Sequence, residues 1–187
     1  MRIVEISLLI LIFSTLGLCS CNTHMSSMEI IAGEKQIYSP NKQFALECVA
    51  NESKKMYEIW VTIKLSGGNF KKQLVFEYER NVSILWSPDS NKLLVNCHTG
   101  SGFVDIYLFR LDKNIFFIED KDLEQLVRDK ITNPILKGGV IDHLYTTGEK
   151  WIDKNIFVAR ANGYGSKTQV DFKYKVNLET QEITKIE

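Results

Sequence analysis

Three residues in one short segment, His98, Ser101 and Asp105, are of the types that form a hydrolytic triad. In such a triad a base removes the proton of the serine nucleophile, and a carboxylate orients the base. The segment 99–102 (TGSG) does not match the strand–turn–helix motif that presents a nucleophilic serine; it is typical of a flexible connection between strands. We therefore expect no catalytic residues and no enzymatic activity.

Other segments contain residue types found in binding sites, but not at the spacing those sites need. Residues 163–168 (GYGSKT) have the composition of a phosphate-binding loop, but the spacing differs and a strand pattern follows, which predicts a hairpin loop. Cys97, His98 and His143 lack the ligand spacing of zinc sites. The acidic residues of segment 119–124 suit the start of a helix and lack the glycine-containing loop of a calcium site. No metal and no cofactor is therefore expected.

The beginning of the chain has the pattern of an export signal. Arg2 precedes an apolar run, Ile6–Leu18, that has the length of a signal-peptide core, about 7–15 residues. A membrane-spanning helix needs about 20 apolar residues, and polar residues follow Cys21 within a few positions. Residues 1–20 are therefore predicted to be a signal peptide.

The segment Leu18-Cys19-Ser20-Cys21 resembles the bacterial lipobox. In that motif an aliphatic residue fills a peptidase pocket, a small residue precedes the cleavage site, and the cysteine thiol accepts the lipid. The resemblance implies cleavage before Cys21 and its acylation, for example with palmitate, giving stable membrane attachment. Asn22, in place of an aspartate, favours the outer membrane with the domain facing the periplasm. Secretory cleavage without acylation and an uncleaved anchor are the alternatives.

The charge balance limits the classes of partner. The chain has 23 Lys and Arg against 23 Asp and Glu, and a neutral chain lacks the concentrated basic face that nucleic acids require. It also lacks the basic excess of a polybasic membrane patch. We expect contact with the membrane through the lipid anchor and no binding of nucleic acid.

Alternating apolar and polar residues dominate the chain after a polar tether at 21–34 and predict strands. The clearest alternation lies at 170–178, where apolar residues occupy every second position. One segment near 121–133 has helical spacing instead, with Asp122 as the candidate cap and Asn133-Pro134 as the expected end. We therefore predict a single, mainly β domain over 35–187 with one short inserted helix.

An internal repeat subdivides this domain. Segment 38–46 (YSPNKQFAL) aligns with 86–95 (WSPDSNKLLV), and 151–158 (WIDKNIFV) is a degenerate third copy. Each copy runs from an aromatic residue through a tight turn into an apolar strand. Proline fixes φ at the first corner of the turn, and Asp or Asn hydrogen-bonds to the nearby backbone.

These segments resemble the blades of TolB-type and prolyl-oligopeptidase-type β-propellers, whose repeats carry a similar Trp-Ser-Pro-Asp-Gly-Lys turn. The resemblance covers about residues 36–120 and 149–187 and implies antiparallel blade-like units. Closed propellers have about four to eight blades, whereas this chain has room for about three. We therefore expect an open propeller-like stack or a sandwich, with sheet edges open to a partner.

Two further features come from the strand pattern. The repeat alignment places Cys48 and Cys97 at equivalent strand positions, so they are a candidate disulfide, the alternative being two buried free thiols. Trp60 lies opposite the apolar face of its strand and is either covered by another sheet or a binding residue.

Taken together, these observations predict a non-catalytic envelope lipoprotein that acts as a protein-binding or scaffold module with an envelope protein as its partner. The alternative is a periplasmic immunity-type inhibitor of an imported toxin.

Overall fold

The computed structural model describes residues 28–30, 36–100, 102–112, 117–138, 141–166 and 168–187. The predicted signal peptide, Cys21 and most of the predicted tether lie outside the described residues. Within the described part of the chain, no helix has the length and apolar character needed to cross a membrane.

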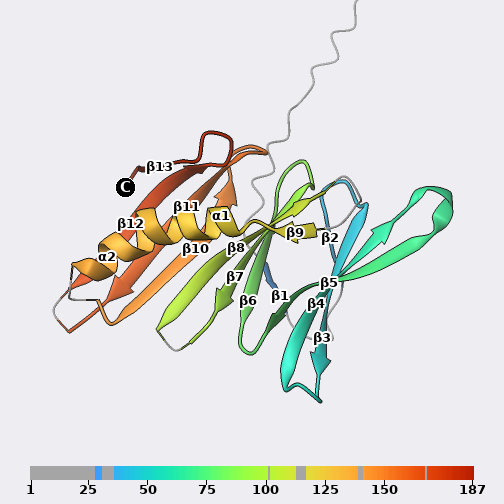
Figure 1. Cartoon of the computed structure of the whole chain (residues 1–187), viewed down its shortest axis with the longest axis horizontal. Coiled ribbons are helices and arrows are strands. Elements are labelled where there is room, and N and C mark those ends of the chain that lie inside the picture. Colours follow the sequence, from blue (N-terminus) through green and yellow to red (C-terminus); the bar gives the residue numbers. More distant parts are fainter. Residues whose placement is uncertain (1–27, 31–35, 101, 113–116, 139–140, 167) are drawn as a thin grey trace, which may run out of the picture.

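Three four-stranded antiparallel units follow one another along the chain (Figure 1), and we call each unit a blade. The first blade contains β2 (Ile37–Tyr38), β3 (Phe44–Asn51), β4 (Met56–Lys64) and β5 (Phe70–Tyr78), with a short 3₁₀ turn at Ser66–Gly68. The second contains β6 (Val82–Trp86), β7 (Lys92–His98), β8 (Phe103–Leu111) and β9 (Phe117–Glu119). The third contains β10 (His143–Trp151), β11 (Ile156–Tyr164), β12 (Gln169–Asn177) and β13 (Glu182–Lys185). The structure is thus an open, propeller-like stack, which confirms the predicted fold class.

The blades are connected to one another in different ways. The first blade is a separate sheet, whereas the second and third are joined where β8 and β10 run parallel over two residue pairs, Phe103–Leu144 and Val104–Tyr145. Residues Met28–Ile30 form β1, which pairs antiparallel with β6. The sequence analysis had assigned β1 to the tether; three residues are too few to show an alternating pattern, and only the hydrogen-bonding edge of β6 makes them a strand.

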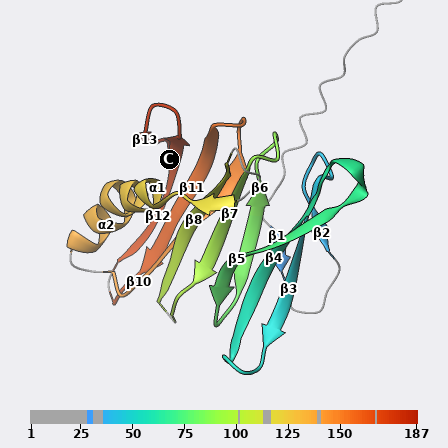
Figure 2. The same cartoon turned by 45° about the vertical axis from the view of Figure 1, so that its right-hand side comes forward.

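The second blade lies between the other two (Figure 2), and both of its faces are buried. Leu93 and Val95 face the first blade, while Leu94 faces the third. This explains why β7 is a continuous apolar run rather than an alternating one. The core between the first two blades is rich in aromatic rings, with Trp86 at centroid distances of 6.0 Å from Phe44 and 5.6 Å from Phe117.

The predicted helix exists but is longer than expected. It consists of α1 (Lys121–Val127), a π-helical turn (Arg128–Thr132) and α2 (Asn133–Lys137), and Leu123, Val127 and Ile131 cover the core between the second and third blades. Its cap is Asp120, which accepts a hydrogen bond from the Leu123 N–H, rather than Asp122. The prediction that the helix ends at Asn133-Pro134 is wrong, because the π-helical turn alters the hydrogen-bond register and Pro134 occupies the first turn of α2.

The repeated turns adopt the same hydrogen bonding in the first two blades. The Ser39 N–H donates to the Phe44 carbonyl and the Ser87 N–H to the Lys92 carbonyl, each at 2.9 Å. In the third blade the Ile152 N–H donates to the Ile156 carbonyl at 2.8 Å, so this turn is one residue shorter. In each of the three blades an aromatic residue is thus followed by a turn and then by a strand.

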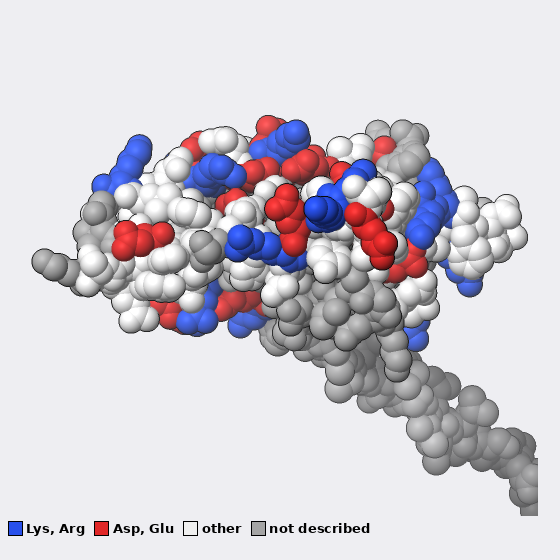
Figure 3. All heavy atoms as spheres, turned by 90° about the horizontal axis from the view of Figure 1, so that it is seen from below, with Lys and Arg blue, Asp and Glu red and all other residues white. Residues whose placement is uncertain are grey.

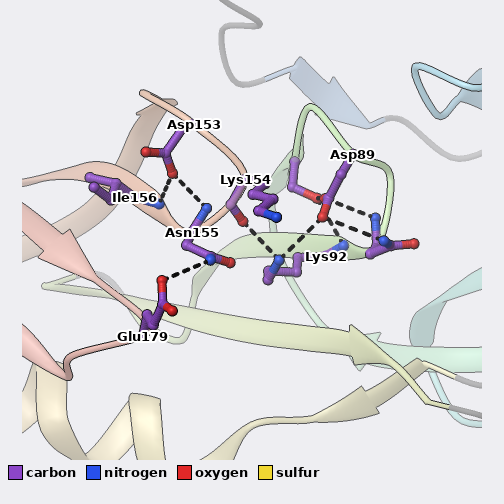
Figure 4. Close-up of polar contacts among 9 residues, drawn as sticks. Asp89, Lys92, Asp153, Lys154, Asn155, Ile156 and Glu179 are labelled. Carbon is purple, nitrogen blue, oxygen red and sulfur yellow. Dashed lines mark hydrogen bonds and ion pairs between the residues drawn. The ribbon is translucent and has the colours of Figure 1, made fainter.

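The turns of neighbouring blades are also linked to each other. The Asn41 N–H donates to Ser90 Oγ at 3.0 Å. Lys92 Nζ donates to the Lys154 carbonyl at 2.7 Å, a contact shown in Figure 4. Lys92 Nζ also lies 3.5 Å from Asp89. These contacts satisfy the charge of a buried lysine and link the turn of each blade to the turn of the next blade.

Candidate functional site

The turn hydrogen bonds define which residues of the three blades are equivalent. Counted from the turns, Glu47 of β3 corresponds to Val95 of β7 and, allowing for the shorter third turn, to Ala159 of β11. The residues that pair with them on the next strand are Trp60, Tyr107 and Tyr174 respectively. Every blade therefore carries a large aromatic residue at the same position of its third strand.

This position is occupied by a core residue in two of the blades. Tyr107 packs against the core between the first and second blades, and Tyr174 belongs to the core between the second and third. Each faces the preceding blade. Trp60 has the same orientation in the first blade, which has no preceding blade among the described residues.

We call the surface around Trp60 the open face. It comprises the outward-pointing residues of the first blade: Tyr38, Ala45, Glu47, Val49, Glu58, Trp60, Thr62, Lys72 and Leu74. The first blade stands at one end of the stack in Figures 1 and 2, and no described element packs on its outer side. Tyr38 and Val49 are 54% and 40% exposed, so the open face has apolar character in contact with solvent.

Hydrogen bonds hold the Trp60 ring in place. Its Nε1–H donates to Glu58 Oε2 at 2.9 Å, and Asn51 Nδ2 donates to Glu58 Oε1 at 2.6 Å. These hydrogen bonds hold the pKa of Glu58 below its usual range, and the bond from Asn51 has the largest effect. Lys54 Nζ forms an ion pair with the same carboxylate, at 3.6 Å from Glu58 Oε1. Trp60 is therefore a half-buried aromatic residue held in one orientation, as an interface anchor requires.

Charged residues flank the ring on the two neighbouring strands. Lys72 Nζ of β5 lies 5.1 Å from the centroid of Trp60, a cation–π contact, and forms an ion pair with Glu47 of β3. Leu74 stands directly opposite Trp60 on β5. The result is an aromatic and aliphatic centre surrounded by charged side chains, the usual arrangement of a protein interface.

The opposite end of the stack is different. The outer face of the third blade, which we call the charged face, carries an ion-pair network around a hollow of about 200 Å³ lined by Glu149, Arg160, Asp171, Lys173 and Glu187. Two bonds of 2.7 Å join the Arg160 guanidinium to Asp171, lowering the pKa of that carboxyl. A polar outer face of this kind is what a terminal repeat needs in water.

Of the two alternatives for the cysteines, the structure has the second, because Cys48 and Cys97 are free and buried rather than joined in a disulfide. The turn register also corrects the repeat alignment: Cys48 is equivalent to Asn96, so the two cysteines are offset by one residue and do not occupy equivalent positions. They lie in the same core on facing blades, with Cys48 Sγ 2.8 Å from the Tyr78 hydroxyl. Burial raises the pKa of both thiols, that of Cys97 to about 11, which makes them unreactive.

The remaining segments that suggested chemistry have structural roles where they are described. Gly163 and Tyr164 end β11, and the Gly165 N–H donates to the Thr168 carbonyl at 2.8 Å just before β12 begins, as predicted for a hairpin loop. Ser101 lies outside the described residues, and Asp105 accepts a hydrogen bond from Thr99 at 3.4 Å. A hollow of about 440 Å³ between β8, β9 and α1 has Arg110 in its wall, but that guanidinium is paired with Asp120. The described residues contain no group of three or more His, Cys, Asp or Glu placed to hold a metal ion.

Sequence reasoning identified Trp60 but missed its neighbours on the open face. Tyr38 was noted only as a repeat aromatic, and Leu74 only as part of an alternating strand. The signal that could have found Tyr38 is the repeat register, because Tyr38 corresponds to Trp86, which is fully buried.

Comparison with known proteins gives a limited result. No protein-family model matches the chain, and no curated protein matches it. Among solved structures, the chain is similar to the β-propeller domain of the Trilobed protease from Pyrococcus furiosus, with 18% sequence identity and a TM-score of 0.48. The match covers 82% of this chain and 43% of the other, so the chain spans less than half the length of that structure.

Proposed function

We propose that this chain is a non-catalytic, lipid-anchored protein of the cell envelope that binds a protein partner through its open face. The lipid on Cys21 holds the domain at the membrane, and the open face provides the contact. The protein thus acts as a binding or scaffold module.

The single observation that carries this proposal is the solvent contact of Trp60. The equivalent residues Tyr107 and Tyr174 lie against inter-blade cores, whereas Trp60 has no described blade against it. Aromatic side chains held rigidly in an apolar centre dominate the binding energy of protein interfaces. The mixed charges around Trp60 supply a rim that can select the partner.

The charge distribution elsewhere supports a protein as the partner. On the face of the molecule shown in Figure 3, basic and acidic side chains are intermixed, and no field of one sign covers it. Intermixed charge fits recognition of a protein surface better than recognition of a polyanion.

A photo-crosslinking amino acid placed at residue 60 of the full chain tests the binding proposal in the intact envelope. Adducts with protein are expected from position 60. The matched control places the same amino acid at Lys175, an exposed residue on the charged face. Equal adducts from both positions, or none from position 60, would overturn the assignment of the open face.

The lipid anchor is tested separately by metabolic labelling with a palmitate analogue. The wild-type chain and the Cys19→Ser variant are expected to incorporate the label, and Cys21→Ser is expected to lose it. Labelling that persists in Cys21→Ser would remove the anchor from the proposal and leave the binding face unaffected.

A further inference from the structure

We propose that the hairpin joining β4 to β5 docks on the lipid bilayer that holds Cys21, and that Phe70 is the residue that enters the membrane interface. We call residues 62–72 the Phe70 hairpin. This inference rests on the lipid anchor of the proposed function. It adds a second membrane contact, and with it the orientation of the domain on the membrane.

The Phe70 hairpin presents an aromatic side chain to solvent. It projects from the first blade (Figure 1), and Phe70 is 68% exposed, more than any other large apolar side chain that the structure describes. Gly67 and Gly68 close the turn with φ of 83° and 81°, a conformation that glycine adopts without strain. Phe70 follows as the first residue of β5 and pairs with Lys64 of β4. The ring is therefore held on a paired strand.

The charge of the hairpin suits an anionic bilayer surface. Residues 59–76 contain three lysines and no acidic residue, although the whole chain has equal numbers of both signs. Lys72 already forms an ion pair with Glu47. Lys64, directly across from Phe70, is exposed and has no ion pair among the described residues. An exposed aromatic ring beside such a lysine can bury the ring at the acyl boundary and leave the ammonium group among the phosphates.

The anchor enters the domain on the side of the stack where the Ser-Pro turns lie. β1 runs antiparallel to β6, with Met28 opposite Ile84 and Ile30 opposite Val82. Since β6 leads through Trp86 into the second Ser-Pro turn, Met28 is the end of β1 nearer that turn. We call this side of the first two blades the turn side.

The Phe70 hairpin lies on the same side. The Asn41 N–H donates to Ser90 Oγ at 3.0 Å, which joins the turns of the first two blades. The Lys64 N–H donates to the Gln43 carbonyl at 3.0 Å, which joins the first of these turns to the base of the hairpin. Residues 65–70 lie beyond this contact, so the tip of the hairpin extends past the turn.

The short connection to the anchor keeps the turn side close to the membrane. Seven residues, 21–27, separate Cys21 from β1. Seven residues span at most about 25 Å when fully extended. A bilayer that holds Cys21 within this distance of Met28 is on the turn side of the domain. The Phe70 hairpin is therefore presented to that bilayer rather than to open solvent.

The two contacts have different roles. The lipid supplies most of the affinity, and it holds the hairpin at a high effective concentration near the surface, so that even a weak second contact forms. That contact stops the domain from rotating about its tether. Because β3 and β4 then run between the membrane and the far end of the blade, the open face points sideways. Its protein partner is thus expected to lie beside the domain at the membrane surface.

The test places a fluorophore at the tip of the hairpin in the full, lipidated chain. Asn69→Cys provides an exposed thiol next to Phe70, and Cys48 and Cys97 stay unlabelled because they are buried. The protein is reconstituted, without any other protein, in vesicles of phosphatidylcholine and phosphatidylglycerol that contain a nitroxide-labelled lipid as quencher. The matched control is Ser53→Cys, on the exposed turn between β3 and β4 at the opposite end of the same blade.

Lipid is expected to quench the label at residue 69 about threefold or more strongly than the label at residue 53, because only the first lies at the bilayer surface. Adding Phe70→Ser is expected to reduce the quenching at residue 69 about threefold, and circular dichroism checks that the variants are folded. Equal quenching at residues 69 and 53, or unchanged quenching after Phe70→Ser, would overturn the inference.

The role of Lys64 is tested by changing both partners of the electrostatic contact. Lys64→Glu is expected to lower the quenching at residue 69 about twofold or more in vesicles that contain phosphatidylglycerol. In vesicles of phosphatidylcholine alone it is expected to have no effect, since the surface there carries no net charge. The same loss in both kinds of vesicle would overturn the assignment of Lys64 to anionic lipid.

The palmitate labelling separates this inference from the proposed function. A label on Cys21 without quenching at residue 69 would retain the anchor and overturn the docking of the hairpin. Absence of both would overturn both. A photo-crosslinking amino acid at residue 70 that forms adducts with an envelope protein, in a chain whose residue 69 is not quenched in vesicles, would assign the hairpin to a protein partner and overturn the inference.

Discussion

The open face of the first blade and the charged face of the third blade are equivalent in one respect, since neither has a described neighbouring blade. Their residues differ. On the charged face, Lys173 and Lys175 occupy the strand positions that hold Ile106 and Leu108 in the second blade, where both are buried. On the open face, the aromatic position of the repeat is kept as Trp60.

The charged face is suited to contact with water, whereas the open face has the residues of a surface that contacts another molecule. A terminal repeat that only needs solubility replaces its inter-blade apolar residues with charged ones, as the third blade does. The first blade retains an aromatic centre with Tyr38 in contact with solvent. An exposed apolar centre of this kind marks an interaction surface. The comparison therefore supports the proposal that the open face binds a partner.

The largest expected effect contrasts Trp86 with Tyr38, which occupy the same repeat position. Trp86 is fully buried and Tyr38 is 54% exposed. Trp86→Ala is expected to lower the free energy of unfolding by about 3–5 kcal/mol, because it leaves a cavity in the aromatic core. Tyr38→Ala is expected to change it by less than about 0.5 kcal/mol. Urea denaturation of both variants measures the difference; equal effects would mean that Tyr38 is not on a free surface.

A smaller effect is expected at the junction of the second and third blades. The Asn96 side chain accepts a hydrogen bond from the Gly148 N–H at 2.7 Å and donates to its carbonyl at 3.0 Å. Asn96→Ala is expected to destabilise the domain by about 2–3 kcal/mol because buried backbone groups lose their partners. Denaturation measures this loss, with exposed Asn91→Ala as the control. A loss no larger than that of the control would show that water replaces the amide.

The contrast between Trp60 and Tyr174 separates binding from stability. Trp60→Ala is expected to cost at most about 1 kcal/mol of folding stability, since its ring is only half-buried, yet to abolish capture of the partner. Tyr174→Ala, at the equivalent buried position, is expected to cost about 3 kcal/mol. Denaturation and partner capture are measured on both variants. Normal capture by Trp60→Ala would remove its role as anchor.

The smallest effect concerns the charged face and pH. The pKa of Asp171 is lowered by the hydrogen bonds from Arg160, so its ionised form favours the folded state. That contribution is present above the ordinary aspartate pKa of about 3.9 and is lost as the pH falls through the lower pKa of the folded state. Asp171→Asn is therefore expected to be slightly less stable than the wild type at pH 7 and equally stable in strong acid. The urea midpoints of the two proteins, measured over a range of pH, check this prediction. A difference between them that does not change with pH would exclude the ion pair as the cause of the lower stability.

The local structure of the domain could be predicted from the residue pattern alone. Alternating residues such as those at 170–178 specify a strand because side chains on a strand point to opposite faces. The Ser-Pro turns specify the corners because proline and the Asn or Asp side chain restrict the backbone there. The repeat of aromatic, turn and strand followed from these local rules, and its resemblance to propeller repeats implied the blade-like architecture.

Features that depend on contacts between distant residues could not be predicted from the residue pattern, because they follow from tertiary packing. The alternation placed Trp60 on one side of its strand, but whether another sheet covers that side depends on how blades stack. The helix passes Pro134 because its apolar residues pack on two blades, and β1 forms because β6 offers a free edge. Cys48 and Cys97 lie in one core on separate sheets and are not bonded. Local residue patterns set the direction of a side chain, whereas the neighbour it meets is set by packing over the whole chain.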